Sequence, residues 1–416
     1  MRLRVDQEQR FTCSQCGLCC RRGWDIAVTA AEVEGYRRAH AERWFREEDG
    51  AHAEPFEPVP GMPGRYRILK REDGSCGFLS AANRCRIHEE LGGASKPLSC
   101  RLFPFRVQPA AGGETLVTAS FCCPTIVRNE GAPLMERELK ALAREWLRDA
   151  GEPRPPQLVR GRPIEPGLAG AVRAAFRAVL DRPDSLADNL ARIALLADDL
   201  GRRRVLKLSD ERLAEYVTLV GAHAARDTTP PRRQRPGALA RLLSRGVLFA
   251  AIAAGEQAKD PRRSGLRLGL RLRLLRLLGH VHGLGPGIDG IDVRWLRRVR
   301  IDLNGPQIHA IVHNYLRSAI EALGSGPRPV LEELSLSVAV LDAAFALGAM
   351  RAGAARREHL TADDLVDGLT QAAELTHAPD TGAFATVLDA LSIGSEPLWR
   401  LAARAAISRA GPGASL

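Results

Sequence analysis

The stretch Cys13-Ser14-Gln15-Cys16-Gly17-Leu18-Cys19-Cys20 places four thiols within eight residues near the start of the chain. It contains two overlapping Cys-x-x-Cys steps and one further adjacent cysteine. Two intervening residues make a loop tight enough for successive thiolates to meet at one ion or cluster, and Gly17 can take the positive φ that such a loop needs. Three thiolates at this spacing suit three corners of a four-iron cluster, whose fourth ligand comes from elsewhere in the chain.

The other five of the nine cysteines lie further along the chain, and none follows Cys123. Taken singly, Cys76 or Cys122 could be no more than a small buried side chain, because free cysteine is often buried. As a group the cysteines need another explanation, since the long segment after Cys123 has none. The candidate metal ligands are Cys13, Cys16, Cys19, Cys20, Cys76, Cys85, Cys100, Cys122 and Cys123.

Disulfides and thiol redox chemistry are the alternatives to metal binding. Nine is an odd number, and each adjacent cysteine pair would close a strained ring. Residues 1–10 are charged and lack the apolar run of a signal peptide, so we expect a cytoplasmic protein, in which stable disulfides are rare. No regular βα pattern of the thioredoxin type follows Cys16. Metal ligation explains the cysteines better than either alternative.

Two kinds of centre fit these cysteines, an iron-sulfur cluster of the 4Fe-4S type and zinc. A zinc site needs only two Cys-x-x-Cys steps. The overlapping triple spacing and the pair Cys123-Pro124 are typical of ferredoxin ligation, so we favour the iron-sulfur cluster and keep zinc as the alternative. His88 follows Cys85 by three residues and is either a further ligand or a side chain that orients one.

The segment from Phe11 to Ile26 resembles the start of the YkgJ-type cysteine cluster family, the Cys-x-x-Cys-x-x-Cys-Cys zinc- or iron-chelating domain. The later residues Cys85-Arg86-Ile87-His88, Pro97, Cys100-Arg101 and Phe103-Pro104-Phe105 are similar to the second half of that domain. This resemblance implies a metal-binding domain over the cysteine region.

The flagellin lysine N-methylases are a related group. Their cysteine region is similar to Gly74–Leu79, Cys85–Gly92 and Ser120–Pro124, and Asn314-Tyr315-Leu316 resembles an Asn-Tyr-Leu segment of the same enzymes. This second resemblance implies a protein-lysine N-methyltransferase that uses S-adenosylmethionine. A Rossmann fingerprint for that cofactor is not evident, because the glycines of Gly283–Gly287 follow an Arg/Leu-rich segment instead of a strand and are expected to form a loop.

A proline-rich stretch at residues 151–167 divides the chain and is predicted to be a linker. Residues 1–150 are expected to form a small irregular α+β cysteine-rich metal-binding domain. Residues 168–416 are rich in Ala, Leu and Arg at helical spacing, and they are expected to form an all-α helical domain. The fold class is therefore predicted to be mainly α.

Local patterns predict the individual elements. The capping box Thr29-Ala30-Ala31-Glu32 predicts a helix from Thr29 to about Glu47. Alternation predicts a strand at Arg65–Lys70 and short extended segments at Arg101–Val107 and Leu116–Ser120, and a closing helix is expected at Pro133–Asp149. In the second region helices are expected to begin near Gly167, Asp184, Ser209, Gly237, Asn304, Leu331, Thr361 and Ser395.

The formal net charge is +11, but lysine occurs at only five positions and arginine is spread along the chain. We interpret the arginine content as a general bias in amino-acid composition. Beyond the basic charge, nothing in the sequence indicates that the protein binds nucleic acid. Residues 262–278 alternate Arg and Leu and are expected to form a helix with a cationic outer face. No segment reaches the about 18 apolar residues that a membrane span needs. His309 and His313 share a helical face and are expected to be packing residues.

Three functions remain open. The leading one is a metal-binding cysteine cluster protein in which Cys13, Cys16, Cys19 or Cys20, Cys85, Cys100 and Cys123 supply thiolates, with Arg101 and nearby amides donating to sulfur. The second is a lysine N-methylase whose helical domain presents a protein substrate. The third is an interaction module that the metal folds and whose helices bind a protein partner. Whether the chain is an enzyme stays open.

Overall fold

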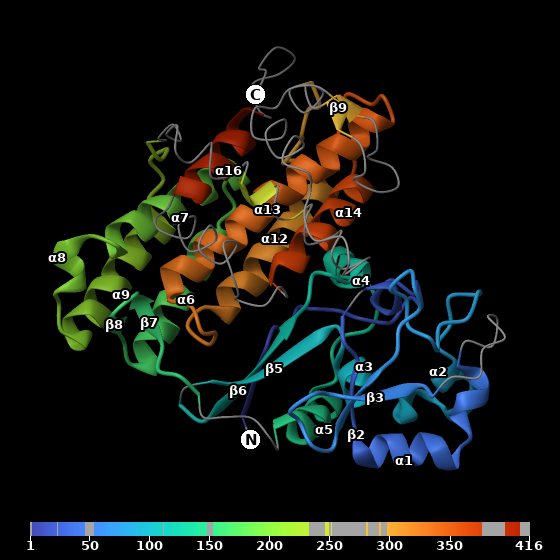
Figure 1. Cartoon of the computed structure of the whole chain (residues 1–416). Coiled ribbons are helices and arrows are strands. Elements are labelled where there is room, and N and C mark those ends of the chain that lie inside the picture. The colour runs from blue at the N-terminus through green and yellow to red at the C-terminus, as the bar shows by residue number, and fades with distance from the viewer. Residues whose placement is uncertain are drawn as a thin grey trace.

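The computed structural model describes residues 2–22, 24–45, 54–110, 112–147, 153–232, 246–248, 251, 280–281, 291–292, 298–376 and 396–407. Small sheets and short helices make up the first third of the chain, and long helices make up the rest (Figure 1). This confirms the predicted class, which was mainly α with a small α+β region ahead of a helical one. Whether the two regions fold as separate domains stays a prediction.

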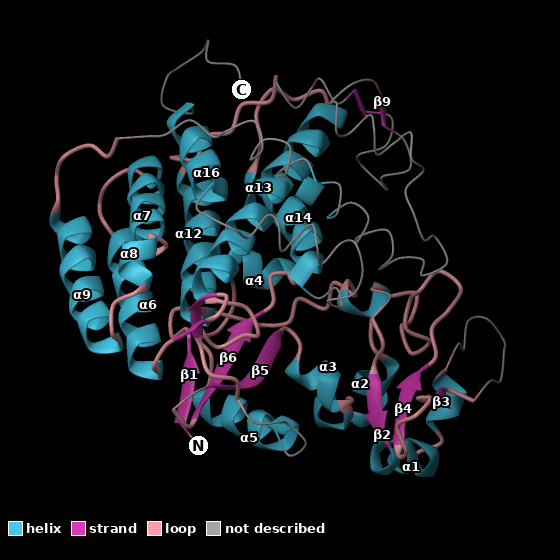
Figure 2. Ribbon diagram, turned by 60° about the vertical axis from the view of Figure 1, so that its left-hand side comes forward, coloured by secondary structure: helices cyan, strands magenta, loops and turns pink. Residues whose placement is uncertain are grey.

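One sheet lies between the helical region and helix α5 (Glu136–Trp146) (Figure 2). Its strands are β1 (Arg2–Val5), β6 (Glu114–Ala119) and β5 (Phe105–Ala110), in that order. β1 runs parallel to β6, and β5 pairs with β6 in antiparallel fashion. Val107 and Val117 lie opposite each other and pack with Leu139 and Ala143 of α5, so this face of the sheet is buried.

A second antiparallel sheet has the order β2 (Ala27–Thr29), β4 (Arg65–Ile68) and β3 (Phe56–Pro58). Helix α1 (Ala30–Arg38) follows β2 and begins with the predicted Thr29–Glu32 capping box, which is confirmed. The predicted extension of this helix to Glu47 is wrong. The helix stops at Arg38 because His40 takes a left-handed conformation with φ 52°, and a 3-10 turn at Ala41–Trp44 follows.

Short elements surround the later cysteines. They are α2 (Arg86–Leu91), α3 (Leu98–Leu102) and α4 (Pro124–Arg128). The prediction of an extended segment over Arg101–Val107 is wrong in its first half, since Arg101 and Leu102 complete α3. The helix ends there because Phe103 precedes Pro104, which disfavours helical backbone at the residue before it, and β5 then begins at Phe105.

The helical region is built around α13, which is buried on almost every side and packs against α12, α14 and α16 (Figure 1). Its helices are α6 (Pro166–Leu180), α7 (Leu186–Leu200), α8 (Arg203–Leu206), α9 (Asp210–Arg226), α12 (Pro306–Ala322), α13 (Val330–Ala354), α14 (Ala362–Ala372) and α16 (Glu396–Ile407). Seven predicted starts are confirmed to within two residues. The eighth, Gly237, lies outside the described residues, as do residues 262–278 and 283–287.

Two small hairpin-like pairs interrupt the helical pattern. β7 (Gln157–Val159) and β8 (Arg162–Pro163) lie inside the predicted linker, joined by a turn in which Gly161 has φ 79°. β9 (His280–Val281) pairs with β10 (Ile291–Asp292) where no strand was predicted, because two-residue strands carry no alternation to detect. Among the described helices, none combines the length and apolar character that crossing a membrane requires.

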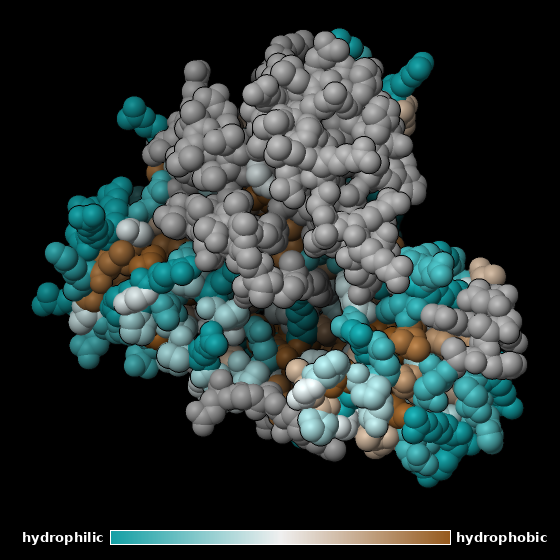
Figure 3. Space-filling view, viewed as in Figure 1, coloured by the Kyte–Doolittle hydropathy of each residue, from teal (hydrophilic) through white to brown (hydrophobic). Residues whose placement is uncertain are grey.

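The described surface in Figure 3 is mostly hydrophilic, with an apolar strip over the helices at its left-hand side. Large exposed apolar side chains on these helices are Leu195 of α7 and Leu219 of α9. Scattered exposed apolar side chains of this kind are normal on folded proteins and identify no site.

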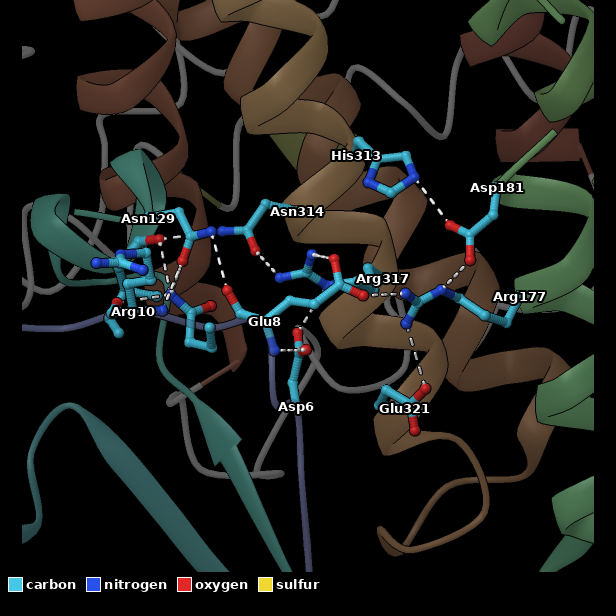
Figure 4. Close-up of polar contacts among 12 residues, drawn as sticks. Asp6, Glu8, Arg10, Asn129, Arg177, Asp181, His313, Asn314, Arg317 and Glu321 are labelled. Atoms are coloured by element: carbon cyan, nitrogen blue, oxygen red, sulfur yellow. Dashed lines mark hydrogen bonds and ion pairs between the residues drawn. The ribbon is translucent and has the colours of Figure 1, made fainter. Parts of the chain in front are cut away.

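Arg317 on α12 anchors the amino-terminal segment to the helical region (Figure 4). Its Nε and Nη1 donate to the carboxylates of Asp6 and Glu8 at 2.8 and 2.6 Å, and its Nη2 donates to Oδ1 of Asn314 at 2.7 Å. The Arg317 side chain is only 5% exposed. Since a buried charge is tolerated when it is paired, these contacts hold residues 6–8 firmly on α12.

Candidate metal centre

Eight of the nine cysteines line one cavity of about 300 Å³. They come from four segments of the chain, namely the first loop (Cys13, Cys16, Cys19, Cys20), the start of α2 (Cys85), α3 (Cys100) and the residues before α4 (Cys122, Cys123). The ninth, Cys76, is buried behind them, and its backbone N–H donates to the carbonyl oxygen of Cys20 at 2.7 Å. The cysteines that are far apart in the sequence thus share one cavity, while the role of each as a ligand stays a prediction.

The first loop has the backbone that its sequence predicts. Gly17 has φ 70°, and Asn83 packs so close that a Cβ at Gly17 would lie 3.2 Å from the Asn83 side chain. The 3-10 turn Cys19–Arg21 closes on the Gly17 carbonyl oxygen, which accepts from the N–H of Cys20 at 3.1 Å. Arg21 donates to Oδ1 of Asn83. These contacts fix the loop, and a side chain at position 17 would be strained by its φ and by Asn83 together.

The adjacent thiols of Cys19 and Cys20 differ from each other. Their Sγ atoms are 3.9 Å apart. This contact with Cys20 lowers the pKa of Cys19 below its usual range, and Lys96 contributes further. The same contact, together with burial, raises the pKa of Cys20. The two adjacent thiols therefore differ in acidity, and the thiolate form is favoured at Cys19, as expected if the two cysteines have different roles.

The deeper thiols are harder to ionise because they are buried. Burial raises the pKa of Cys76 and Cys85, and it raises that of Cys100 to about 12. Lys96 is a cation beside Cys85 and Cys100, and Lys70 is a cation beside Cys76. Burial opposes the charge on Lys96, but Cys100, Cys85 and Cys19 outweigh it and raise the pKa of the ammonium group. Lys96 thus supplies positive charge to a cavity that needs thiolates.

Two of the cysteines stand at the starts of helices. Cys85 directly precedes α2, and the backbone amides of His88 and Ile87 favour its thiolate against the effect of burial on its pKa. Cys123 directly precedes α4. Burial raises the pKa of Cys123 to about 11, and the amides of Ile126 and Thr125 act in the opposite direction. Free amides at a helix start are a common way to stabilise thiolate charge.

Cys122 also lines the cavity, and one charged group near it, Glu374, comes from the helical region. Glu374 lies in the 3-10 turn Ala373–Thr376 that follows α14, and one of its oxygens is 3.0 Å from Nε of Arg22. Nε1 of Trp24 donates to the other oxygen at 3.1 Å. Burial raises the pKa of Glu374 and, more strongly, that of Cys122, while Arg22 and Arg106 oppose both shifts. The Arg22–Glu374 ion pair is almost completely buried and joins the first loop to the helical region.

Arg101 and His88 were both predicted to act at the metal centre, and their contacts can now be compared with that prediction. Arg101 donates to the Lys96 carbonyl oxygen at 3.0 Å and to the Glu145 carboxylate at 2.7 Å. The prediction that Arg101 donates to sulfur is therefore wrong, and Lys96 is one cation that does line the cavity. His88 does line the cavity.

His309 and His313 stack on α12 with ring centroids 6.0 Å apart, and His313 Nε2 lies 3.0 Å from Oδ1 of Asp181. Neither histidine lines the cysteine cavity.

Lys96 and Glu374 were not predicted from the sequence to lie near the thiols. Lysine is rare in this arginine-rich chain, and Lys96 lies four residues before Cys100, which is a weak signal that could have been noticed. No sequence pattern indicated that Glu374 lies near the cysteines, because it is 350 residues from Trp24 and in a region without cysteines.

The donors of this cavity fit a metal that prefers sulfur. They are thiols supported by amides and by one ammonium group, a set that suits zinc or iron. In a tetrahedral zinc site neighbouring sulfur atoms lie about 3.8 Å apart, because the zinc-sulfur bond is about 2.3 Å long. Within the part of the chain that is described, no three His, Cys, Asp or Glu side chains lie close enough together to hold one ion.

The cysteine region matches a known protein family. Residues 12–124 match the family described as "CxxCxxCC: Putative zinc- or iron-chelating domain". The protein MJ0939 of Methanocaldococcus jannaschii is 28% identical over 146 residues, which are 34% of this chain and 46% of that protein. The chain thus spans about half the length of this relative, which carries the name "uncharacterized protein". No solved structure matches the chain. The region that holds all nine cysteines belongs to the CxxCxxCC family of zinc- or iron-chelating domains.

Proposed function

We propose that the cysteine cavity holds an iron-sulfur cluster of the four-iron type. The observation that carries this proposal is the spread of eight thiols around one wide cavity. A zinc ion and a four-iron cluster each take four protein ligands, so the width of the cavity, and not the number of thiols, favours the larger group. A four-iron cluster is larger and accepts thiolates from several directions, so it fits the width of the site.

The residues that would hold the cluster follow from their positions. Cys13, Cys16 and Cys19 come from one fixed loop and would supply three thiolates. Cys100 or Cys123 would supply the fourth from across the cavity. A cluster of this type supplies electron transfer or a Lewis-acidic iron atom when it is bound.

Other residues of the chain would regulate charge and water at the centre. Lys96 offsets negative charge at the sulfur atoms, and the first amides of α2 and α4 face Cys85 and Cys123. Two aromatic rings, Phe11 and Phe103, form apolar parts of the cavity wall. They are held by ring contacts, since Phe11 packs on Phe105 at 5.6 Å and Phe103 packs on Trp24 at 5.1 Å. Polarity and hydrogen bonding near sulfur set the reduction potential of such clusters.

The test is the visible absorption spectrum of the full chain after anaerobic purification. The proposal predicts a brown protein with broad charge-transfer bands near about 400 nm that bleach on reduction with dithionite. A colourless protein that retains stoichiometric zinc would overturn it, because zinc has no such transitions. Cys16→Ser, purified in the same way, is the control for adventitious iron and should lack the bands.

A second candidate function is a lysine N-methylase, and two contacts support it. Asn314 and Tyr315, from the segment that resembles the methylases, lie directly against the Cys122–Cys123 segment. Nδ2 of Asn314 donates to the Ile126 carbonyl oxygen at 3.1 Å, and the Tyr315 ring meets the Phe121 ring edge to face at 4.9 Å. In this proposal the helical region presents a protein substrate, and S-adenosylmethionine is the methyl donor.

Incubation with labelled S-adenosylmethionine and cell extract tests the methylase proposal. Transfer of label to a protein band, lost in Cys16→Ser, supports it. Absence of transfer with the metal-loaded protein leaves the cluster proposal standing and removes the methylase.

A further inference from the structure

A second cavity, of about 220 Å³, lies where the β1-β6-β5 sheet meets the helical region. Its wall contains Arg4 of β1, Glu114 of β6, Arg173 of α6 and Ser325, which follows α12. No residue of the cysteine cavity lines it. Small-molecule pockets commonly have volumes of about 300 to 1,000 Å³, so a cavity of this size suits a smaller ligand.

Arg173 has donors to spare. Its Nη1 donates to the Leu323 carbonyl oxygen at 2.9 Å, and this is its one hydrogen bond to the described residues. None of the described carboxylates lies within ion-pair distance of its guanidinium group. Burial, followed by the nearby positive charge of Arg4, lowers the pKa of Arg173 to about 10, although Glu321 and Glu114 oppose the shift from beyond ion-pair distance. The group stays protonated at neutral pH, and its charge is therefore held partly buried beside a like charge.

Arg4 is positioned by the surrounding chain. Its Nη1 donates to the Glu321 carbonyl oxygen at 2.6 Å, and its Nη2 donates to Oγ of Ser325. Its Nε lies 3.3 Å from the Glu114 carboxylate, and Nε of Arg2 lies 3.3 Å from the other oxygen of the same carboxylate. The Glu114 carboxylate thus forms ion pairs with both Arg2 and Arg4, whereas Arg173 has no carboxylate partner among the described residues. The lining of the cavity carries an excess of positive charge.

The first turn of α6 adds backbone donors to the same wall. Pro166 and Gly167 line the cavity, and no side chain caps this end of the helix. The N–H of Gly167 makes no hydrogen bond to another described residue. The first amides of a helix have no acceptor within the helix, and they carry partial positive charge toward whatever lies beyond its end.

We propose that this cavity binds a small oxyanion, a phosphate group, between the guanidinium groups of Arg173 and Arg4 and the first turn of α6. An arginine fork can donate two parallel hydrogen bonds to phosphate, and helix starts bind the same group through backbone amides. A phosphate group would neutralise the like charges that face each other across the cavity. The ligand is either the free ion or the phosphate end of a small ester.

Isothermal titration of the metal-loaded full chain at constant ionic strength tests this proposal, with inorganic phosphate and glycerol 3-phosphate as the two probes. Arg173→Gln removes the arginine with spare donors and is expected to weaken binding at least tenfold. Glu114→Gln removes the one carboxylate of the wall and is expected to tighten binding. Arg212→Gln, at an exposed position on α9, removes the same charge away from the cavity and is expected to change nothing.

Arg173→Gln is expected to weaken phosphate binding and Glu114→Gln to tighten it. Misfolding of one variant therefore cannot imitate the whole expected result, because a misfolded protein would not bind phosphate more tightly. Tighter binding of inorganic phosphate identifies the free ion as the ligand, and tighter binding of glycerol 3-phosphate identifies an ester. Either result, with the expected order of variants, supports the site. No measurable binding by the wild-type chain overturns the proposal, as does equal weakening in Arg173→Gln and Arg212→Gln, which would indicate only bulk charge.

Discussion

Asn314 donates a hydrogen bond from its side-chain amide to the carbonyl oxygen of Ile126 at 3.1 Å. Ile126 belongs to α4, which begins directly after Cys123. The Asn314 oxygen in turn accepts from Arg317, whose guanidinium also binds Asp6 and Glu8 (Figure 4). One polar chain therefore connects the cysteine segment before α4, the amino-terminal segment and α12. The helical region helps to position the thiols of Cys122 and Cys123.

We predict that Asn314→Ala lowers the free energy of unfolding by about 1 to 3 kcal/mol, because the Ile126 carbonyl oxygen and the Arg317 guanidinium lose a buried partner. Metal should also be lost to a chelator faster than from the wild-type chain. Denaturant titration and chelator kinetics measure the two effects. Thr218→Ala is the control, since it removes an exposed hydrogen bond to Ala214 on α9 and should change neither quantity. Unchanged metal release in Asn314→Ala would show that α12 does not position this segment.

We predict that Cys16→Ser removes far more metal than His88→Ala. Both residues line the cavity, but Cys16 lies in the fixed loop between Cys13 and Cys19. A serine hydroxyl is harder and much less acidic than a thiol, so it replaces thiolate poorly on iron or zinc. Losing a side chain that only orients a ligand lowers metal affinity by about 10- to 100-fold. Metal content per chain, measured after identical anaerobic purification, decides between them, and equal retention would mean that Cys16 is not a ligand.

We predict that Arg22→Ala destabilises the chain by about 3 to 5 kcal/mol, because it leaves the buried carboxylate of Glu374 without its guanidinium partner. The matched control is Arg37→Ala. Its partner Glu54 is half exposed, as Arg37 itself is, and such surface pairs contribute about 0 to 1 kcal/mol. Denaturant titration of both variants gives the comparison. Equal destabilisation would contradict the view that the Arg22–Glu374 pair is a buried link between the regions.

We predict a stability difference between the wild-type chain and Glu333→Gln that depends on pH. Burial raises the pKa of Glu333 from 4.5 to about 7, although Arg328 and other arginines oppose the shift. Folding therefore favours the protonated acid. Its contribution is fully present below about pH 4.5 and is lost as the pH rises through about 7. Denaturant midpoints at pH 5, 6, 7 and 8 should show the wild-type chain losing stability relative to Glu333→Gln, and a constant difference would contradict the assignment.

Sequence patterns predicted the elements that depend on local rules. The Thr29 capping box and the helix starts at Ser209 and Thr361 rest on contacts within one turn, so the residues themselves indicate them. The early end of α1 was not predicted, because it depends on the left-handed conformation of His40, which even histidine adopts in only a minority of cases. The short α3 was missed because five residues carry too little periodicity to identify a helix, although Pro104 marks its end.

Some residues of the candidate site could likewise be predicted from local sequence patterns, and others could not. Spacing and clustering identified the cysteines because metal ligands need particular residue types at particular intervals. Lys96 and Glu374 affect the thiols through their charges, and their distances from the thiols depend on the tertiary fold. No local sequence pattern indicates those distances. Arg101 was assigned to sulfur from its place beside Cys100, but its side chain turns toward Glu145 instead.

The most direct test of the central claim is the iron, acid-labile sulfide and zinc content of the wild-type chain after anaerobic purification. A four-iron cluster in the cysteine cavity predicts about four iron atoms and about four sulfides per chain, with zinc far below one. It also predicts that the iron and sulfide fall together in Cys16→Ser. One zinc per chain without sulfide would contradict the cluster.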